Sequence, residues 1–525
     1  MRQVRAHPSS ACRSPQAAPE LDVARVLTIA GERACLARLG GTTPTMPPSQ
    51  SRQVSYQDST AHLPSRRTTD SGRRIAAFLP ALLALLSVAF PAARSEAPVS
   101  RHVVLISLDG FPASALADPL TPVPTLQRLG REGAVAKALL PVNPVVTWPN
   151  HTTMVTGVRP AVHGVMFNGL LIRDGDGPPR IEPWRDKTEW VRAPTVYDAA
   201  HAAGLTTAEV DWVAIFKAPT ITWTFPEVPN PAGPIELEMI AAGVLSAGDV
   251  ATFHEGTSGA WRDQRWTDAA VHIVERHTPN LLLFHLLALD GINHRYGPGT
   301  PASLTAMAFL DGQVARLLAA VDRAGIRDRT TVVIVSDHGF RVAAKSIHPN
   351  VRLRELGLIT GSEGNLRAEA WSRSWGGASG IYIRDRSRRE EVLRRIVGPL
   401  RALEGVERAI PGQDLPSLQF PDPSTLDQAP DLVLTAAKGY DFEDEDSGQI
   451  ITPAPADHLG HHGAVETDPD MEAIFIASGK DVMPGRTLET VRNLDIAPTI
   501  AEWLGVALPN VEGRSLASEL AKGAP

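Results

Sequence analysis

From position 102 onward, near-continuous apolar runs alternate with stretches of helical period. Three runs have the length and apolar content of buried parallel strands, and an aspartate follows each of them. They cover residues 102–108, 281–289 and 330–336. Helical patterns lie between them, at 125–132, 195–203, 267–277 and 301–324. This order, with acids at the strand ends, predicts an α/β fold with a doubly wound, mostly parallel sheet flanked by helices.

The pattern loosens between positions 340 and 460. Apolar runs at 381–383 and 432–434 and an amphipathic stretch at 390–403 predict a small inserted α+β lobe there. A strand at 473–477 and a helix at 494–504 then return to the main domain, which we expect over residues 100–520. The stretch 208–259 holds many Pro, Gly and Trp residues, so we expect it to form an irregular wall around a pocket.

The first 97 residues differ in composition from the rest. Residues 1–72 are rich in Arg, Ser, Thr and Pro without a sustained apolar period, which favours a disordered extension or a segment outside the natural product. Residues 73–97 combine two arginines, an apolar run and small residues at a cleavage site, as in a signal peptide. The run is short for a membrane span, and an uncleaved anchor is the alternative. We expect translation to start downstream of Met1, and a periplasmic or secreted bacterial product.

Charge and cysteine content narrow the function classes. Residues 1–100 carry 12 Arg, no Lys and 6 acidic residues, so the net charge of −7 for the whole chain leaves −13 for the remainder. An acidic balance disfavours a nucleic-acid polymer as partner but suits a small charged substrate held by metal ions. Both cysteines, Cys12 and Cys35, precede the regular pattern, which excludes disulfides and thiol chemistry in the main domain.

The stretch 144–157 is where we expect a nucleophile. Pro149 has the fixed φ of a first helical turn, which places Thr147 at a helix start where backbone N–H groups attract anions. A hydroxyl at that point can attack phosphorus. An ordinary helix cap is the simpler interpretation of Thr147 alone, and only the acids and imidazoles elsewhere in the chain favour catalysis.

Carboxylates and imidazoles recur at the predicted strand ends and turns. The set consists of Asp109, Asp290, His294, Asp337, His338 and His462. Six oxygen and nitrogen ligands suit zinc at about three protein groups per ion, so they divide into two open zinc sites. Singly, an Asp-Gly pair after a strand is usually just a turn. The other histidines of the central region are expected on the surface or in the core, without a role: His254, His272, His277 and His285.

These motifs resemble those of the nucleotide pyrophosphatase/phosphodiesterase family, within the alkaline phosphatase superfamily. The resemblance rests on residues 107–111, 147–151, 290–298, 336–339 and 462–463, and the ending at 495–516 is similar to that superfamily's last helix and turn. The match runs from 103 to 516 in the expected order. It implies an alkaline phosphatase-like catalytic domain with the lobe inserted at about 340–460.

Carried over by motif, the resemblance implies a role for each candidate residue. Asp109, Asp337 and His338 would hold the zinc that also binds Thr147 Oγ. Asp290, His294 and His462 would hold the second zinc, which stabilises the leaving oxygen. Asn168 matches the family's amide donor to a non-bridging phosphate oxygen, and His462 is preferred over His461 because the family ligand directly precedes Gly. A phospho-threonine intermediate and net retention at phosphorus follow.

The sequence departs from the family pattern at two places. Asn293 stands where family members commonly have Gly before the second-site His. Residues 209–214 keep Trp212 but lack the Trp-Pro-Gly of nucleotide-hydrolysing relatives, and they also lack the Lys-x-Arg with which threonine-dependent monoesterases neutralise an extra charge. We expect Trp148 and Trp212 either to form a stacking wall for a leaving group or to lie in the core. The acidic run 439–446 predicts a solvated loop, with a weak extra cation site as the alternative.

The leading expectation is an exported two-zinc phosphodiesterase or pyrophosphatase that hydrolyses a small phosphodiester, nucleotide-like in character. Membrane contact is expected only through the export segment. A same-fold phosphomonoesterase or phosphonate hydrolase is the first alternative. A non-catalytic metal-binding surface protein is the second.

Overall fold

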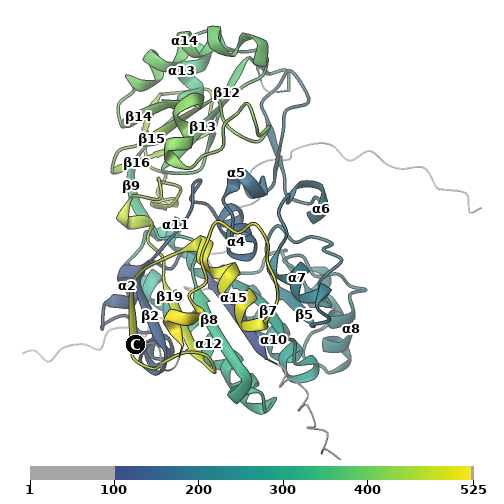
Figure 1. Ribbon diagram of the computed structural model, residues 1–525. Helices are drawn as coiled ribbons and strands as arrows, with labels where there is room; N and C mark the ends of the chain where they lie inside the picture. The colour runs from purple at the N-terminus through teal and green to yellow at the C-terminus, as the bar shows by residue number, and fades with distance from the viewer. Residues whose placement is uncertain (1–100, 363, 522–525) are drawn as a thin grey trace, which may run out of the picture. The chain divides into compact units, whose positions relative to one another are not determined.

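The computed structural model describes residues 101–362 and 364–521, and an eight-stranded sheet forms its centre (Figure 1). The predictions for 1–72 and 73–97 lie outside these residues. Across the sheet the strands are β20 (Arg486–Arg492), β2 (Ala134–Leu140), β19 (Phe475–Gly479), β8 (Thr330–Val335), β1 (His102–Leu108), β7 (Leu281–Leu286), β5 (Thr207–Val210) and β6 (Trp223–Phe225). Only β19 runs antiparallel to its neighbours. The predicted mostly parallel sheet is therefore confirmed.

Helices cover both faces of this sheet. One face carries α3 (Pro124–Glu132), α8 (Pro234–Ala241), α10 (Gly259–His277) and α12 (Pro301–Arg323), and the other carries α4 (Thr147–Thr156), α7 (Val196–Ala202) and α15 (Ile496–Leu504). Because successive side chains of a strand point to opposite faces, β1 serves both layers: Ile106 and Leu108 belong to the first core, Leu105 to the second.

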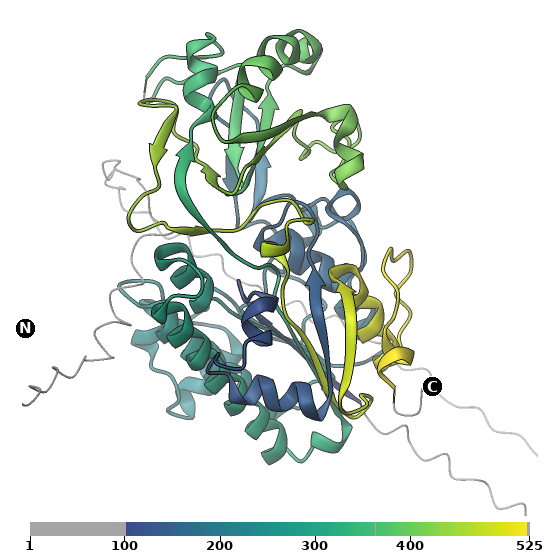
Figure 2. The same ribbon diagram turned by 90° about the vertical axis from the view of Figure 1, so that its left-hand side faces the viewer.

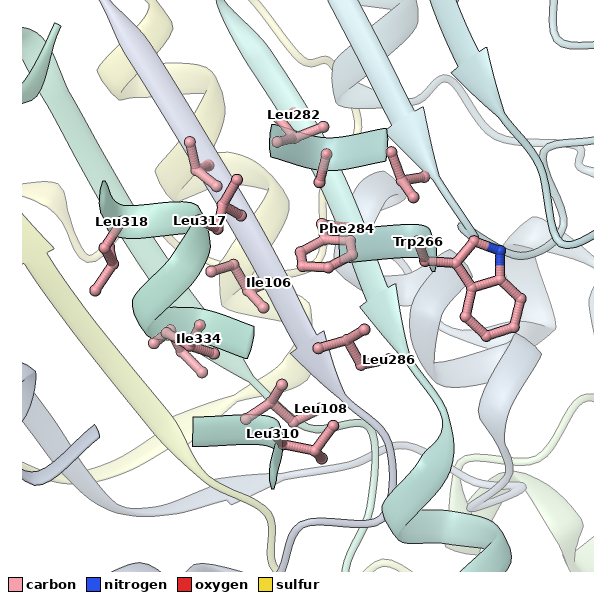
Figure 3. Close-up of a cluster of buried hydrophobic side chains, with 14 of the residues drawn as sticks. Ile106, Leu108, Trp266, Leu282, Phe284, Leu286, Leu310, Leu317, Leu318 and Ile334 are labelled. Carbon is pink, nitrogen blue, oxygen red and sulfur yellow. The ribbon is translucent and has the colours of Figure 1, made fainter. Parts of the chain in front are cut away.

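The first core explains why long apolar segments are needed here. Figure 3 shows Phe284 and Leu286 of β7 packed with Ile106 and Leu108 of β1 under the helices. Each such side chain stabilises the fold by about 1.5–3 kcal/mol on full burial. Helix α12 is long and apolar enough to cross a membrane by length and composition, but its residues Leu310 and Leu317 are buried in this core.

Residues 341–461 form smaller sheets of their own, drawn in green to yellow-green in Figure 2. The first is antiparallel, in the order β12 (Ala370–Ser374), β13 (Ala378–Ile383), β15 (Leu432–Ala436) and β14 (Val406–Pro411). Helices α13 (Pro349–Glu355) and α14 (Arg389–Arg401) share its apolar core. A second sheet joins β16 (Gly439–Phe442), β9 (Arg341–Ile347), β17 (Ile451–Pro453) and β18 (Gly460–His461). Its strand β9 begins two residues after Gly339.

Short elements complete the described chain. The helices are α2 (Ala113–Ala117), α5 (Pro160–His163), α6 (Lys187–Trp190), α9 (Ala247–Ala251), α11 (Ala288–Tyr296) and α16 (Ala517–Leu520). The strand pairs are β3 (Leu170–Ile172) with β4 (Arg180–Glu182), and β10 (Ile359–Thr360) with β11 (Arg367–Ala368).

Two local expectations are wrong. The stretch 208–259 is more regular than its composition indicates, because β5 and β6 extend the main sheet and Pro234 begins α8 instead of interrupting it. The strand after residue 281 is shorter than expected, since β7 ends at Leu286 and α11 starts at Ala288. Asp290 and His294 therefore lie on a helix and not in a turn.

Candidate metal centre and active site

Three of the predicted ligands meet where β1 and β8 end. Asp109, Asp337 and His338 are buried and place one ligand atom each within 4.8 Å of one another. His338 Nε2 lies 3.1 Å from Asp337 Oδ2 and 3.5 Å from Asp109 Oδ1. None of these three atoms has a hydrogen-bond partner. Buried polar atoms without partners are costly, so their convergence fits a bound cation.

The other three predicted ligands form a second cluster. Asp290, His294 and His462 also place ligand atoms within 4.8 Å of one another. On α11 the four-residue spacing puts Asp290 and His294 on one face, with 3.5 Å between Asp290 Oδ1 and His294 Nε2. His462 Nε2 lies 4.0 Å from the same carboxylate oxygen. The expected convergence thus holds, although a helix and not a turn supplies two of its members.

The imidazoles of both clusters are oriented in the same way. The Nδ1 atoms of His294, His338 and His462 lie 3.0, 3.2 and 3.0 Å from the backbone carbonyl oxygens of Gly460, Gly339 and Val145. A ring that donates its Nδ1–H to a carbonyl keeps Nε2 as a lone-pair donor, which is the arrangement typical of metal-binding histidines. The His338 and His462 rings stack at 3.8 Å, so the two clusters adjoin.

Thr147 is the first residue of α4, next to both clusters. His151 Nδ1 donates to the Thr147 carbonyl oxygen at 2.9 Å, and the same nitrogen lies 3.7 Å from Asp337 Oδ2. The carbonyl of Val145, two residues before Thr147, accepts the bond from His462. Asn168 accepts a hydrogen bond from the Trp148 N–H at 3.0 Å through its Oδ1, which leaves the amide nitrogen as a donor.

A cavity of about 300 Å³ opens beside these residues. Asn168, His294 and His462 line it from the main domain, and Trp375 and Phe442 line it from residues 341–461. Its wall therefore combines the candidate metal ligands with aromatic side chains.

Electrostatics favour a cation at the two clusters. Burial, together with the charges of Asp337 and Asp290, raises the pKa of Asp109 to about 8. Burial and the neighbouring His338 and His294 push the pKa of His462 well below its ordinary value. A bound dication would lower the pKa of Asp109 again, and it would bind the imidazole of His462 in the neutral form that the low pKa favours.

No sequence motif singles out His285, yet it contacts a predicted ligand. Its Nε2 donates to Asp109 Oδ2 at 3.1 Å, and its Nδ1 donates to the Asp211 carbonyl at 3.0 Å. Burial opposes protonation of His285, but its bonds to Asp109 and Asp211 raise its pKa well above the ordinary value. The expected core position of His285 is therefore confirmed, and the structure adds its contact with Asp109. A histidine inside the otherwise apolar β7 was the available signal.

The tryptophan wall does not form. Trp212 is buried beside His151, with ring centroids 4.9 Å apart, and Trp148 packs on Trp190 at 5.6 Å. The aromatic lining of the cavity comes instead from Phe167 and Trp375, whose rings lie 5.3 Å apart.

Residues 103–465 match the family described as type I phosphodiesterase / nucleotide pyrophosphatase. The match covers more than half of the sequence, and the chain belongs to this family. The resemblance inferred from the motifs is thereby confirmed.

Known relatives agree with this assignment. Human ectonucleotide pyrophosphatase/phosphodiesterase family member 1 is 24% identical over 274 residues, which are 50% of this chain and 27% of that protein. The chain thus spans about a quarter of its length. Rat family member 7 is 22% identical over 432 residues, 81% of this chain and 89% of the relative. An uncharacterised pyrophosphatase/phosphodiesterase of Schizosaccharomyces pombe is 24% identical over 78% of each chain.

Solved structures show the same fold. An inactive form of murine ectonucleotide pyrophosphatase/phosphodiesterase 5 in complex with AMP has a TM-score of 0.61 and 17% identity, and covers 80% of this chain and all of that one. Human member 5 has a TM-score of 0.61 and 18% identity, with the same coverage. The alkaline phosphatase-like fold expected from the motifs is confirmed.

Proposed function

We propose that this protein is a two-zinc phosphodiesterase that hydrolyses a small phosphodiester through a phospho-threonine at Thr147. The observation that carries the proposal is the convergence of two clusters, each of three potential ligands, beside one threonine at a helix start. Family membership supports the reaction class, hydrolysis of phosphodiester or diphosphate bonds.

The donor set fits two metal ions. Two carboxylates and one imidazole form the first cluster, and one carboxylate and two imidazoles form the second. Such mixed oxygen and nitrogen sets with three protein ligands are typical of open zinc sites. When bound, the two ions would lower the pKa of a hydroxyl nucleophile and neutralise charge on the leaving oxygen.

The chain's own groups supply position and specificity. The start of α4 directs Thr147 and its neighbouring backbone N–H groups toward an anion. Thr147 Oγ attacks phosphorus, the bond to the leaving oxygen breaks, and water later attacks the phospho-threonine from the opposite side. Two inversions give net retention. Asn168, fixed by the Trp148 N–H, donates from its amide nitrogen to a non-bridging oxygen.

A diester is favoured over a monoester because the cavity beside the site offers no extra positive side chain. Among the described residues that line it there is no arginine or lysine. A monoester carries one more anionic oxygen, which would lack a partner there. Phe167 and Trp375 offer an apolar face for a base or an aryl leaving group, consistent with a nucleotide-like substrate.

The test compares Thr147→Ala with Thr152→Ala, a matched change on the same helix. Thr152 Oγ donates to the Trp148 carbonyl within α4, so its loss should leave the reaction intact. Thr147→Ala should lower the rate of hydrolysis of bis-p-nitrophenyl phosphate at least about 10³-fold, as expected when a nucleophile is removed, while the zinc content stays the same. Equal rates for wild type and Thr147→Ala would overturn the proposal. If wild type hydrolysed p-nitrophenyl phosphate or phosphonoacetate faster than bis-p-nitrophenyl phosphate, the substrate would be a monoester or a phosphonate and not a diester.

We further propose export to the periplasm or medium, on the pattern of residues 73–97. N-terminal sequencing of the exported protein checks it, because a cleaved signal predicts a mature start near residue 98. An intracellular product with residues 73–97 intact would contradict export.

A further inference from the structure

A third group of potential ligands lines the same cavity. Asp441, Glu443 and His458 place one ligand atom each within 4.8 Å of one another. Asp441 belongs to β16, which pairs with β9, and Glu443 continues from the end of that strand. All three residues line the same cavity as His294 and His462.

The sequence predicts that Asp441 belongs to a solvated acidic loop, but in the structure its side chain is buried. It is 1% exposed, and its Oδ1 has no hydrogen-bond partner. The nearby arginines are engaged elsewhere: Arg341 with Asp468, Arg373 with Asp444 and Arg354 with Asp446. In the described part of the chain, no lysine or arginine forms an ion pair with any member of the group. Arg341 and His348 lie near enough to act on the charge of Asp441, but among the described residues neither carboxylate has a Lys or Arg ion-pair partner.

His458 connects this group to the candidate metal centre. Its ring stacks on that of His294, with centroids 4.9 Å apart and an angle of 19° between the planes. An anionic phosphoester that reached Thr147 through the cavity would pass close to Asp441 and Glu443. Uncompensated negative charge there would repel it, whereas a bound dication would neutralise both carboxylates.

We propose that Asp441, Glu443 and His458 bind a third divalent cation that accepts mixed oxygen and nitrogen donors, such as Mn²⁺ or Zn²⁺. Two carboxylate oxygens and one imidazole nitrogen provide three protein ligands, and water completes the coordination. The ion offsets the acidic charge of the cavity wall and attracts the anionic substrate. Its binding is independent of the reaction at Thr147, but its effect on substrate rests on the proposed function.

The experiment counts metal ions on the full-length chain. The protein is loaded with zinc, titrated with Mn²⁺ alone, freed of unbound metal and analysed for zinc plus manganese per chain by mass spectrometry. We expect three ions per chain for wild type, and two for each of the single variants Asp441→Asn and Glu443→Gln. The matched control is Glu445→Gln, a change in the same acidic run at an exposed side chain outside the group, which should retain three. Thermal melting confirms that each variant is folded.

The outcomes separate clearly. Two ions in wild type, or equal loss in Glu443→Gln and Glu445→Gln, would overturn the third site. An unchanged metal count in Glu443→Gln with a raised KM for a substrate carrying a quaternary ammonium group would show instead that these carboxylates bind a cationic part of the substrate. Failure of the Thr147→Ala test would leave the metal count unaffected, so the two proposals can fail separately.

Discussion

Replacing His285 by Gln tests whether a buried imidazole behind Asp109 orients the metal centre. In the structure His285 is fully buried and donates to Asp109 Oδ2 at 3.1 Å, while Asp109 Oδ1 points to the cluster with Asp337 and His338. Without the imidazole the carboxylate can rotate, and its charge is less well compensated. Partners that orient a metal ligand typically contribute about 10–100-fold in metal affinity, or about 1.4–2.7 kcal/mol.

The assay for this prediction is competition for zinc with a chromophoric chelator. We expect the site formed by Asp109, Asp337 and His338 to weaken about 10–100-fold in His285→Gln. His254→Gln serves as the control, because His254 is exposed and its Nε2 bonds to the Glu227 carbonyl and not to a candidate ligand. Unfolding in denaturant, measured on the same samples, should show a loss of about 3–5 kcal/mol for His285→Gln, since it leaves a buried charge without its partner. Wild-type zinc affinity with wild-type stability would refute the reasoning and make His285 an ordinary core residue.

Two further predictions concern the scaffold. Asp263 of α10 accepts hydrogen bonds from the Leu287 and Ala288 N–H groups, at 3.0 and 2.9 Å, where α11 begins. Asp263→Asn should therefore lower the free energy of unfolding by about 1–2 kcal/mol and weaken zinc binding at Asp290 and His294, whereas Asp311→Asn, which removes a comparable cap from α3, should lower the stability without changing zinc affinity. Equal zinc affinities in the two variants would contradict the coupling between this cap and the metal site. Burial raises the pKa of Glu209 from 4.5 to about 7, so the folded state holds the proton of this carboxyl more tightly than the unfolded state does. The resulting contribution to stability is complete below pH 4.5 and is lost as the pH rises through 7. In metal-free buffer, Glu209→Gln should flatten the pH dependence of the free energy of unfolding by at most about 3 kcal/mol over that window, and parallel curves for the two proteins would reject the assignment.

The sequence predicted the features that depend on local pattern. The strand over 102–108 and the helix over 301–324 are long and strongly periodic, and the structure reproduces both within one residue. The convergence of Asp109, Asp337 and His338 followed from a property of parallel sheets, whose strand ends meet at one edge. In the structure, Asp109 and Asp337 follow strands that are direct neighbours, β1 and β8, which brings their side chains close together.

The features that were missed depend on tertiary contacts. Sequence cannot tell that β7 lies beside β1 in a register that pairs Ser107 with His285, so the contact of His285 with Asp109 was invisible. The burial of Asp441 was also missed, because the sequence does not reveal that its strand, β16, pairs with β9. For Trp212 the sequence left a stacking wall and a core position open, and its packing against His151 decides for the core.

The central claim is that Thr147 carries the phosphoryl group between two bound metal ions. The most direct measurement is mass spectrometry of peptides from enzyme quenched in acid during turnover of a phosphodiester. We predict a phosphoryl adduct on the peptide that contains Thr147, absent in Thr147→Ala. Hydrolysis by wild type without any adduct, together with undiminished turnover by Thr147→Ala, would contradict it.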